Sequence, residues 1–207
     1  MKFCHRISDA CDGISYEKRY TAAMQTLETI KTRRAVRGWN EKEVPEKILF
    51  QILDAGRYAP SPLNSQPWHF TLVRNTDTIK KLMEHANHGS FLSLAKIVIV
   101  VTVQKQAKID EWLAEHEQHI YSGVCAMQNM WLAAWDLGLG ACWVTLDEKT
   151  TRELLRIPDN HKLLGSLGLG YAASPVKPHE EKDRQSLLGM VSYDQFGSSP
   201  HEVIRKE

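Results

Sequence analysis

A segment beyond the middle of the chain places the strongest constraint on the fold. Residues 124–140 read VCAMQNMWLAAWDLGLG, and they are apolar nearly all the way around a helix. A helix of this kind needs to be buried on every side, either inside a fold or between two tightly associated chains. Gly138 and Gly140 mark its end. The rest of the chain must therefore cover this helix, or a second copy must do so.

Four stretches have the composition and length of β-strands. The clearest is residues 96–103 (KIVIVVTV), because so many β-branched residues favour a buried strand. The others are Trp68–Val73, Ala141–Leu146 and Leu163–Tyr171. Helical patterns cover residues 24–37, about 45–56, about 78–86, 110–136 and about 148–155. Because helices bracket the strands without a strict alternation, the sequence predicts an α+β fold and not a doubly wound parallel sheet.

Composition excludes several classes of function. The chain has 207 residues, with 26 Lys and Arg against 25 Asp and Glu, which leaves a net charge of +1. Such a balanced chain has no general attraction to nucleic acid or to an anionic membrane, so any anion must be bound by a local cluster. No apolar run approaches the roughly 20 residues that span a bilayer, and the four cysteines form no C-x-x-C pair. We therefore expect a cytoplasmic protein with neither a membrane nor a nucleic-acid partner.

Three arginines near the start form the first candidate site. On a helix over residues 24–37, Arg33, Arg34 and Arg37 would lie within an arc of about 100° that continues the apolar stripe from Met24. Unpaired cations on a core-facing side are costly, and a phosphate group matches the planar donor fork of arginine. A simpler interpretation is that the cations complement the C-terminus of the helix or extend their stems along the surface. Both interpretations remain open from this segment alone.

The second candidate site is the loop predicted for residues 59–67 (APSPLNSQP). Its prolines fix the backbone, and Asn64 and Gln66 each present an amide with donors and an acceptor. A rigid loop with spaced amides suits the polar edge of a heteroaromatic ring. The alternative is a plain turn that leads into the next strand.

Taken together, these segments resemble the FMN-dependent nitroreductase family. Four motifs occur in the family's order: Arg33-Arg34-x-x-Arg37, Pro60-Ser61-x-x-Asn64-x-Gln66-Pro67-Trp68, Gly138-Leu139-Gly140-x-x-Trp143, and Gly170-Tyr171 followed by Arg184, Leu187 and Tyr193-Asp194. The resemblance implies an FMN-binding domain over residues 24–196, with an N-terminal extension at 1–23 and a C-terminal tail at 197–207. It also implies the family's fold, a mostly antiparallel central sheet flanked by helices in an intertwined homodimer.

The resemblance implies which residues would hold the FMN phosphate. The arginine motif of the family holds the phosphate and ribityl chain or approaches the isoalloxazine ring, and this assigns those roles to Arg33, Arg34 and Arg37. Arg184 matches a further phosphate ligand. A phosphate monoester carries up to about two negative charges, so several arginines suit it electrostatically.

Other matching positions would surround the flavin ring. The partner subunit's loop lies against the flavin in this family, which implies that role for Pro60, Ser61, Pro62 and Asn64. Gln66 lies in the same motif and would position the loop or the flavin. One flavin face would be lined by a strand end formed by Trp143, Val144, Thr145 and Leu146. Ala35 stands where the family often has Ser, so one hydrogen bond of the family is expected to be absent.

The implied activity is that of an NAD(P)H oxidoreductase with a tightly but non-covalently bound FMN. NAD(P)H would reduce the flavin, and a nitroaromatic, a quinone or a similar small acceptor would reoxidise it in a ping-pong cycle. Flavin N5 carries the hydride chemistry, so no side chain is assigned a catalytic role and no metal is expected. Arg37 is the candidate for stabilising negative charge on the reduced flavin. The alternatives are a specialised flavoenzyme of the same fold, such as a dehalogenase or a dehydrogenase, and a flavin-binding protein without turnover.

Histidines and one cysteine offer weaker alternatives. His85 with His88 and His116 with His119 have a helical i, i+3 spacing that could bind a metal. Both segments are polar, so we expect surface histidines without a ligand. Cys142 has no identifiable His or Asp partner and is expected to pack beside Trp143.

Overall fold

The computed structural model describes residues 26–86, 91, 94–105, 111–177 and 184–198. The chain divides into two units, Met1–Val176 and Lys177–Glu207, and the first contains the folded core. The predicted extension at residues 1–23 lies outside the described residues. Within the described residues, no helix is both long enough and apolar enough to cross a membrane.

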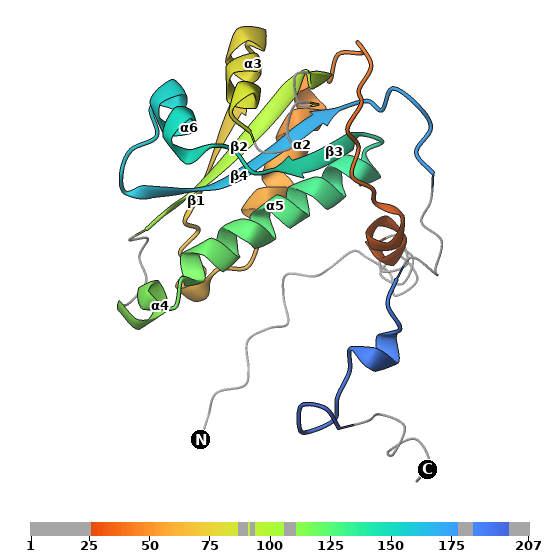
Figure 1. The fold of residues 1–207 in the computed structure, drawn as a ribbon, viewed down its shortest axis with the longest axis vertical. Coiled ribbons are helices and arrows are strands. Elements are labelled where there is room, and N and C mark those ends of the chain that lie inside the picture. Colours follow the sequence, from red (N-terminus) through yellow and green to blue (C-terminus); the bar gives the residue numbers. More distant parts are fainter. Residues whose placement is uncertain (1–25, 87–90, 92–93, 106–110, 178–183, 199–207) are drawn as a thin grey trace, which may run out of the picture. The chain divides into compact units, whose positions relative to one another are not determined.

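A four-stranded antiparallel sheet forms the centre of the first unit (Figure 1). Its strands are β1 (Trp68–Val73), β2 (Ile97–Gln104), β3 (Gly140–Val144) and β4 (His161–Gly170), and their spatial order is β1-β2-β4-β3. All three neighbouring pairs are antiparallel. The predicted α+β class and the four predicted strands are therefore confirmed, with small differences at the strand ends.

One face of the sheet packs against α2 (Glu46–Arg57) and α5 (Gln118–Asp136). The two helices cross closely at Gly56, where a Cβ would lie 2.8 Å from Cγ of Met130. The apolar helix that dominates the sequence is thus α5, and its sheet-facing side is buried as expected. Tyr121, which is 58% exposed, and Val124 lie on its outer side, so one chain does not cover this helix completely.

The opposite face packs against α3 (Thr76–Glu84) and α6 (Glu148–Leu155). Both helices begin with a side-chain cap, because Asn75 accepts the N–H of Thr78 at 2.9 Å and Asp147 accepts the N–H of Thr150 at 2.8 Å. Alternating residues of β2 and β3, such as Val98 and Cys142, fill the space beneath them. This face also receives Trp39, which links it to the N-terminal segment.

The structure also contains three short helices. They are η1 (Pro62–Asn64), α4 (Glu111–Glu115) and, in the second unit, η4 (Leu187–Gly189). The prediction that residues 110–136 are mostly helical is confirmed for the described residues, in two helices, because Glu117 adopts a left-handed conformation (φ 54°) between α4 and α5. A left-handed residue cannot continue a right-handed helix, so the chain changes direction there.

Candidate functional site

The arginine motif lies in an extended segment, not on a helix. Helical structure covers residues 26–32, and the prediction that this helix continues to Arg37 is wrong. The N–H of Val36 donates to the carbonyl of Ala141 at 3.0 Å, and Ala35 forms an isolated parallel bridge with Ala141. Pairing with the edge of β3 therefore replaces the next helical turn. Alternating side chains along this segment point to opposite sides, which separates the arginines that the helical arrangement grouped together.

Three contacts fix this segment to the core. Val36 packs against Gly140, where a Cβ would lie 2.6 Å from the Val36 side chain, so only glycine permits the approach. Nε1 of Trp39 donates to the carbonyl of Gly140 at 2.8 Å. At the helical end, Nε1 of Trp135 donates to Oγ1 of Thr32 at 3.0 Å. The backbone that carries the arginines is thus held by β3 and by the last turn of α5.

Arg34 is buried against the end of the helix. It is 7% exposed, and its Nη1 donates to the carbonyls of Lys31 at 3.0 Å, Thr32 at 2.8 Å and Arg33 at 2.7 Å. The simpler interpretation, that a cation complements the C-terminus of the helix, is thus confirmed for Arg34. Its buried Nε has no hydrogen-bond partner among the residues that the structure describes.

Arg33 and Arg37 lie near the thiol of Cys142. The guanidinium of Arg33 lies 4.1 Å from the ring centroid of Trp131, and that of Arg37 lies 5.7 Å from the ring of Phe91. Burial raises the pKa of the Cys142 thiol, and the charges of Arg37 and Arg33 oppose that shift. The thiol therefore stays protonated, as expected of a packing residue, while both cations lie close enough to affect it.

The ion pairs of the described residues set Arg34 and Arg37 apart from other arginines of the chain. Within the described ranges, Arg34 and Arg37 form no salt bridge, whereas Arg57, Arg74 and Arg152 each pair with an acidic residue. In the same part of the chain, no group of three or more His, Cys, Asp or Glu side chains is placed to hold a metal ion. The chemistry available beside β3 is therefore that of guanidinium groups, which suits an anionic ligand.

The strand end predicted to line a flavin alternates between the two faces of the sheet. Val144 and Leu146 are buried on the same face as Cys142. Trp143 packs with the cluster on the α5 side, and a Cβ on Gly165 would lie 2.9 Å from its Nε1. Thr145 is exposed just beyond the strand. These four positions thus share one strand end but not one face.

The predicted loop presents its amides on a constrained backbone. Leu63, Asn64 and Gln66 all have positive φ, at 51°, 53° and 46°. Residues other than glycine rarely adopt this backbone conformation. Oγ of Ser61 accepts the N–H of Gln66 at 3.1 Å, and Nε2 of Gln66 donates to the carbonyl of Asn64 at 3.2 Å. Pro60 and Asn64 are exposed and Pro62 is half-buried. The loop is therefore shaped by internal bonds while the side chain of Asn64 remains accessible.

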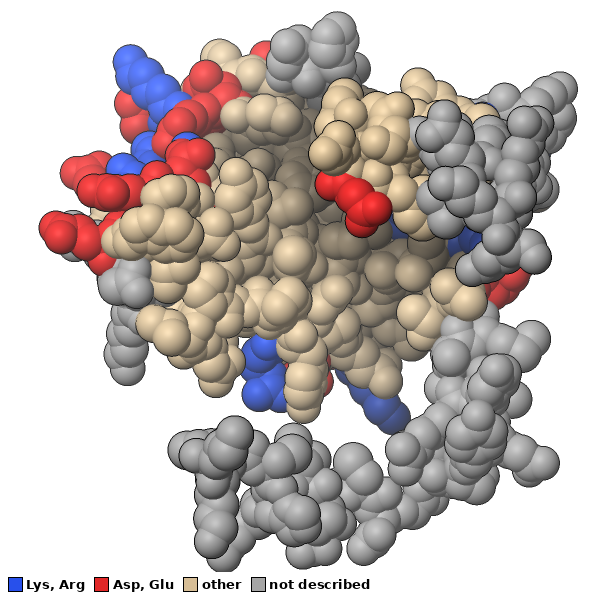
Figure 2. Space-filling view, turned by 90° about the horizontal axis from the view of Figure 1, so that it is seen from below, with Lys and Arg blue, Asp and Glu red and all other residues tan. Residues whose placement is uncertain are grey.

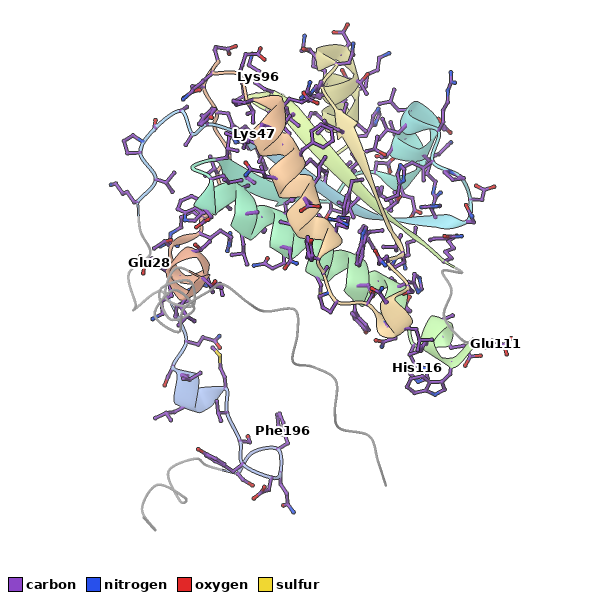
Figure 3. All side chains as sticks on the ribbon, turned by 180° about the vertical axis from the view of Figure 1, so that it is seen from behind. Glu28, Lys47, Lys96, Glu111, His116 and Phe196 are labelled. Atoms are coloured by element: carbon purple, nitrogen blue, oxygen red, sulfur yellow. The ribbon has the colours of Figure 1, made fainter. Side chains whose placement is uncertain are left out.

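One chain does not bring the arginines and this loop together. The helix over residues 26–32 is attached to the last residues of α5, because Thr29 donates to Asp136 at 3.0 Å and Thr32 accepts from Trp135. The turn η1 contacts α5 and lies beside its first turns (Figure 1). Figure 3 shows the same separation, with Glu28 near one end of α5 and His116 near the other. The 19 residues of α5 span about 28 Å between these ends.

Arg184 belongs to the second unit and is exposed there. Its assignment as a phosphate ligand stays a prediction. His119, by contrast, corrects an expectation, because it is only 7% exposed at the start of α5 and not a surface histidine. Burial lowers the pKa of its imidazole, which favours the neutral form. Its polar sequence context gave no sign of this burial.

The sequence did not indicate the aromatic rings beneath the arginines. Trp131 packs against the cluster on the α5 side, and its ring also supports Arg33. Phe91 contacts both Trp39, at a centroid distance of 6.3 Å, and Arg37. No local pattern links these positions, because they lie far apart in sequence and meet only at the edge of β3.

Comparison with known proteins identifies the family. The Nitroreductase family profile matches residues 30–90 and 86–171. A protein of Methanothermobacter thermautotrophicus, provisionally named NADH dehydrogenase/NAD(P)H nitroreductase, is 35% identical over 155 residues, which is 72% of this chain and 78% of the relative.

Solved structures agree with this match. An FMN-dependent nitroreductase from Clostridium difficile is 27% identical with a TM-score of 0.71, covering 82% of this chain and 99% of that one. A provisionally named nitroreductase from Desulfovibrio desulfuricans, solved in complex with FMN, is 27% identical with a TM-score of 0.69, covering 83% and 97%. The chain described here belongs to the nitroreductase family.

Proposed function

We propose that this protein is an FMN-dependent oxidoreductase that uses NAD(P)H to reduce small acceptors such as nitroaromatics or quinones. The observation that carries the proposal is the pair of guanidiniums, of Arg33 and Arg37, that lies near Cys142 beside β3 and within the family match. The FMN-dependent and FMN-bound relatives support the choice of ligand.

The residues present fit a flavin phosphate. The guanidiniums of Arg33 and Arg37 both lie near Cys142, and the planar donor fork of arginine matches the oxygens of a phosphate. Arg33 and Arg37 would hold the phosphate and ribityl chain, since aromatic rings support both and β3 fixes their backbone. Once bound, FMN supplies the hydride-transfer chemistry that no side chain provides. Arg37 holds positive charge at this edge and would favour a ligand that gains negative charge.

The site would be completed by a second copy of the chain. Because the arginines and the loop lie at opposite ends of α5, a loop that contacts the same flavin must come from a partner. The outer sides of α2, η1 and α5 expose apolar side chains that a partner would cover, namely Phe50, Tyr58, Leu63, Tyr121 and Val124. Figure 2 shows a broad surface with few charged residues at its centre. A homodimer would bury this surface and supply Ser61, Asn64 and Gln66 in trans.

An anaerobic absorbance experiment tests the activity. Protein loaded with FMN should show flavin absorbance that bleaches with NADH or NADPH and returns when a nitroaromatic or a quinone is added. The Arg33→Gln/Arg37→Gln double variant should retain little flavin. Arg57→Gln, which removes an exposed cation on α2, should behave as wild type.

Two outcomes would contradict the proposal. Protein that remains colourless after incubation with FMN would remove the basis for flavin chemistry. Flavin-loaded protein that does not oxidise NAD(P)H would instead indicate a flavin-binding protein without this turnover. Initial rates that give intersecting rather than parallel double-reciprocal lines would argue against the ping-pong cycle.

A further inference from the structure

We infer that Arg34 is a positioning residue and not a ligand of the anion. It holds the turn that carries Arg33 and Arg37 to the edge of β3. This inference rests on the proposed function, because it concerns how the same FMN site is assembled. It divides the Arg-Arg-x-x-Arg motif into two outer residues that bind and one inner residue that organises the backbone.

The hydrogen bonds of Arg34 carry the argument. The last carbonyls of a helix have no partners within the helix, and leaving them buried without partners is costly. A single nitrogen, Nη1 of Arg34, donates to three of them, at Lys31, Thr32 and Arg33, over 2.7–3.0 Å. The positive charge also faces the negative end of the helix dipole, which offsets the cost of burying a guanidinium. Binding a phosphate through Nη1 would compete directly with these bonds.

The position of Arg34 along the extended segment agrees with this role. Successive side chains of an extended chain point to opposite sides, so Arg33 and Arg37 share one side. Arg34 lies on the other side together with Val36, and both are buried, at 7% and 6% exposure. The two outer arginines lie near Cys142, where both charges act on its thiol. The motif thus directs its outer cations and its inner cation to different places.

Arg34 also fixes the start of the extended segment. The carbonyl of Arg33 is one of its three acceptors, so the peptide that follows Arg33 is restrained at the point where the helix ends. From that point the chain runs to Val36, whose N–H reaches Ala141. Without the guanidinium, the carbonyls of residues 31–33 lose their shared donor. The backbone at Arg33 is then no longer held in place, and the position of the Arg33 side chain is no longer fixed.

The first experiment measures FMN affinity as a function of ionic strength. Loss of a direct cation–phosphate contact weakens affinity and also reduces its salt dependence, because salt screens that attraction. Arg33→Gln and Arg37→Gln should show both effects. Arg34→Gln should raise the dissociation constant about tenfold while leaving the salt dependence as in wild type. Arg34→Lys should behave like Arg34→Gln, because lysine keeps the charge but lacks the planar fork.

Thr29→Ala is the matched control. It removes the bond from Thr29 to Asp136, which anchors the same helix, but leaves the carbonyl cluster intact. Its FMN affinity should stay within about twofold of wild type. The inference is overturned if Arg34→Gln reduces the salt dependence and Arg34→Lys restores affinity, since that pattern identifies a direct anion ligand.

A second measurement does not depend on flavin. In protein without FMN, hydrogen exchange of the Arg33 amide, which donates to the carbonyl of Thr29 at 2.9 Å, should be at least tenfold faster in Arg34→Gln than in wild type or Arg37→Gln. Faster exchange in a protein that binds no flavin would support the role of Arg34 and refute the proposed function. Unchanged exchange would refute the role of Arg34 whether or not flavin binds.

Discussion

Replacing Gly140 with alanine tests how the arginine segment is attached to the sheet. A Cβ at this position would lie 2.6 Å from Cβ, Cγ1 and Cγ2 of Val36. Rotation about χ1 of Val36 moves its two methyl groups but not its Cβ, so a rotamer change does not remove the clash. The backbone of the segment would have to move away from β3. That movement would also strain the 2.8 Å bond from Trp39 to the Gly140 carbonyl.

The expected loss of stability follows from this geometry. Forcing one extra methyl group into a packed interior costs about 1–3 kcal/mol, and the stiff contact places Gly140→Ala near the middle of that range. For a chain of this size, about 2 kcal/mol lowers the melting temperature by roughly 4–8 °C. Gly38→Ala is the matched control, because among the described residues its Cβ would meet only the Cβ of Ala173, at 4.0 Å. That variant should be as stable as wild type or gain up to about 1 kcal/mol.

Urea unfolding of the flavin-free protein measures these differences directly. Gly140→Ala should lower the midpoint without changing the slope, and Gly38→Ala should not lower it. FMN affinity should fall in Gly140→Ala and stay unchanged in Gly38→Ala. Equal midpoints for Gly140→Ala and wild type would refute the reasoning, because Val36 would then not pack on Gly140 and the arginines would be held in another way.

Two further predictions concern residues outside the arginine segment. Because burial lowers the pKa of His119 below its ordinary 6.5, the protein should lose stability as the pH falls from about 6.5 through the folded-state pKa, and His119→Gln should flatten this part of a plot of urea midpoint against pH. Arg152→Gln should cost about 1–3 kcal/mol in urea unfolding, because Arg152 pairs with Glu148 at 2.9 Å and donates to the carbonyls of Pro158 and His161. A flat profile in wild type, or an unchanged midpoint for Arg152→Gln, would contradict these assignments.

Sequence patterns predicted the strands and helices that depend mainly on the residues of their own segment. The β-branched run at residues 96–103 forms β2, and the apolar run after Tyr121 lies in α5. Where the prediction failed, a distant partner decided the outcome. The helix at residues 26–32 ends early because Ala141 offers a carbonyl to Val36, and no feature of the arginine segment itself reveals that acceptor. The helical pattern over residues 110–136 is confirmed, but the break at the left-handed Glu117, between α4 and α5, cannot be read from helical periodicity.

The same distinction holds for the candidate site. The types of residue were predictable, since several arginines indicate an anion and spaced amides indicate a ring with a polar edge. Their arrangement was not, because the distance between Arg37 and Asn64 depends on where each segment attaches along α5. The different role of Arg34 was equally hidden, because three neighbouring arginines have the same chemistry until the backbone separates them.

The shared flavin site is the central claim, and a mixed dimer tests it most directly. Arg37→Gln removes a cation from one half of the site, and Asn64→Asp adds a negative charge to the loop with little change in shape. If each site combines the arginines of one chain with the loop of the other, a dimer of the two variants contains one doubly altered site and one intact site. Its measured FMN content should be about half that of wild type, and each variant alone should bind little. A mixed dimer that binds no more FMN than either variant alone, or a monomer that retains FMN, would contradict the account.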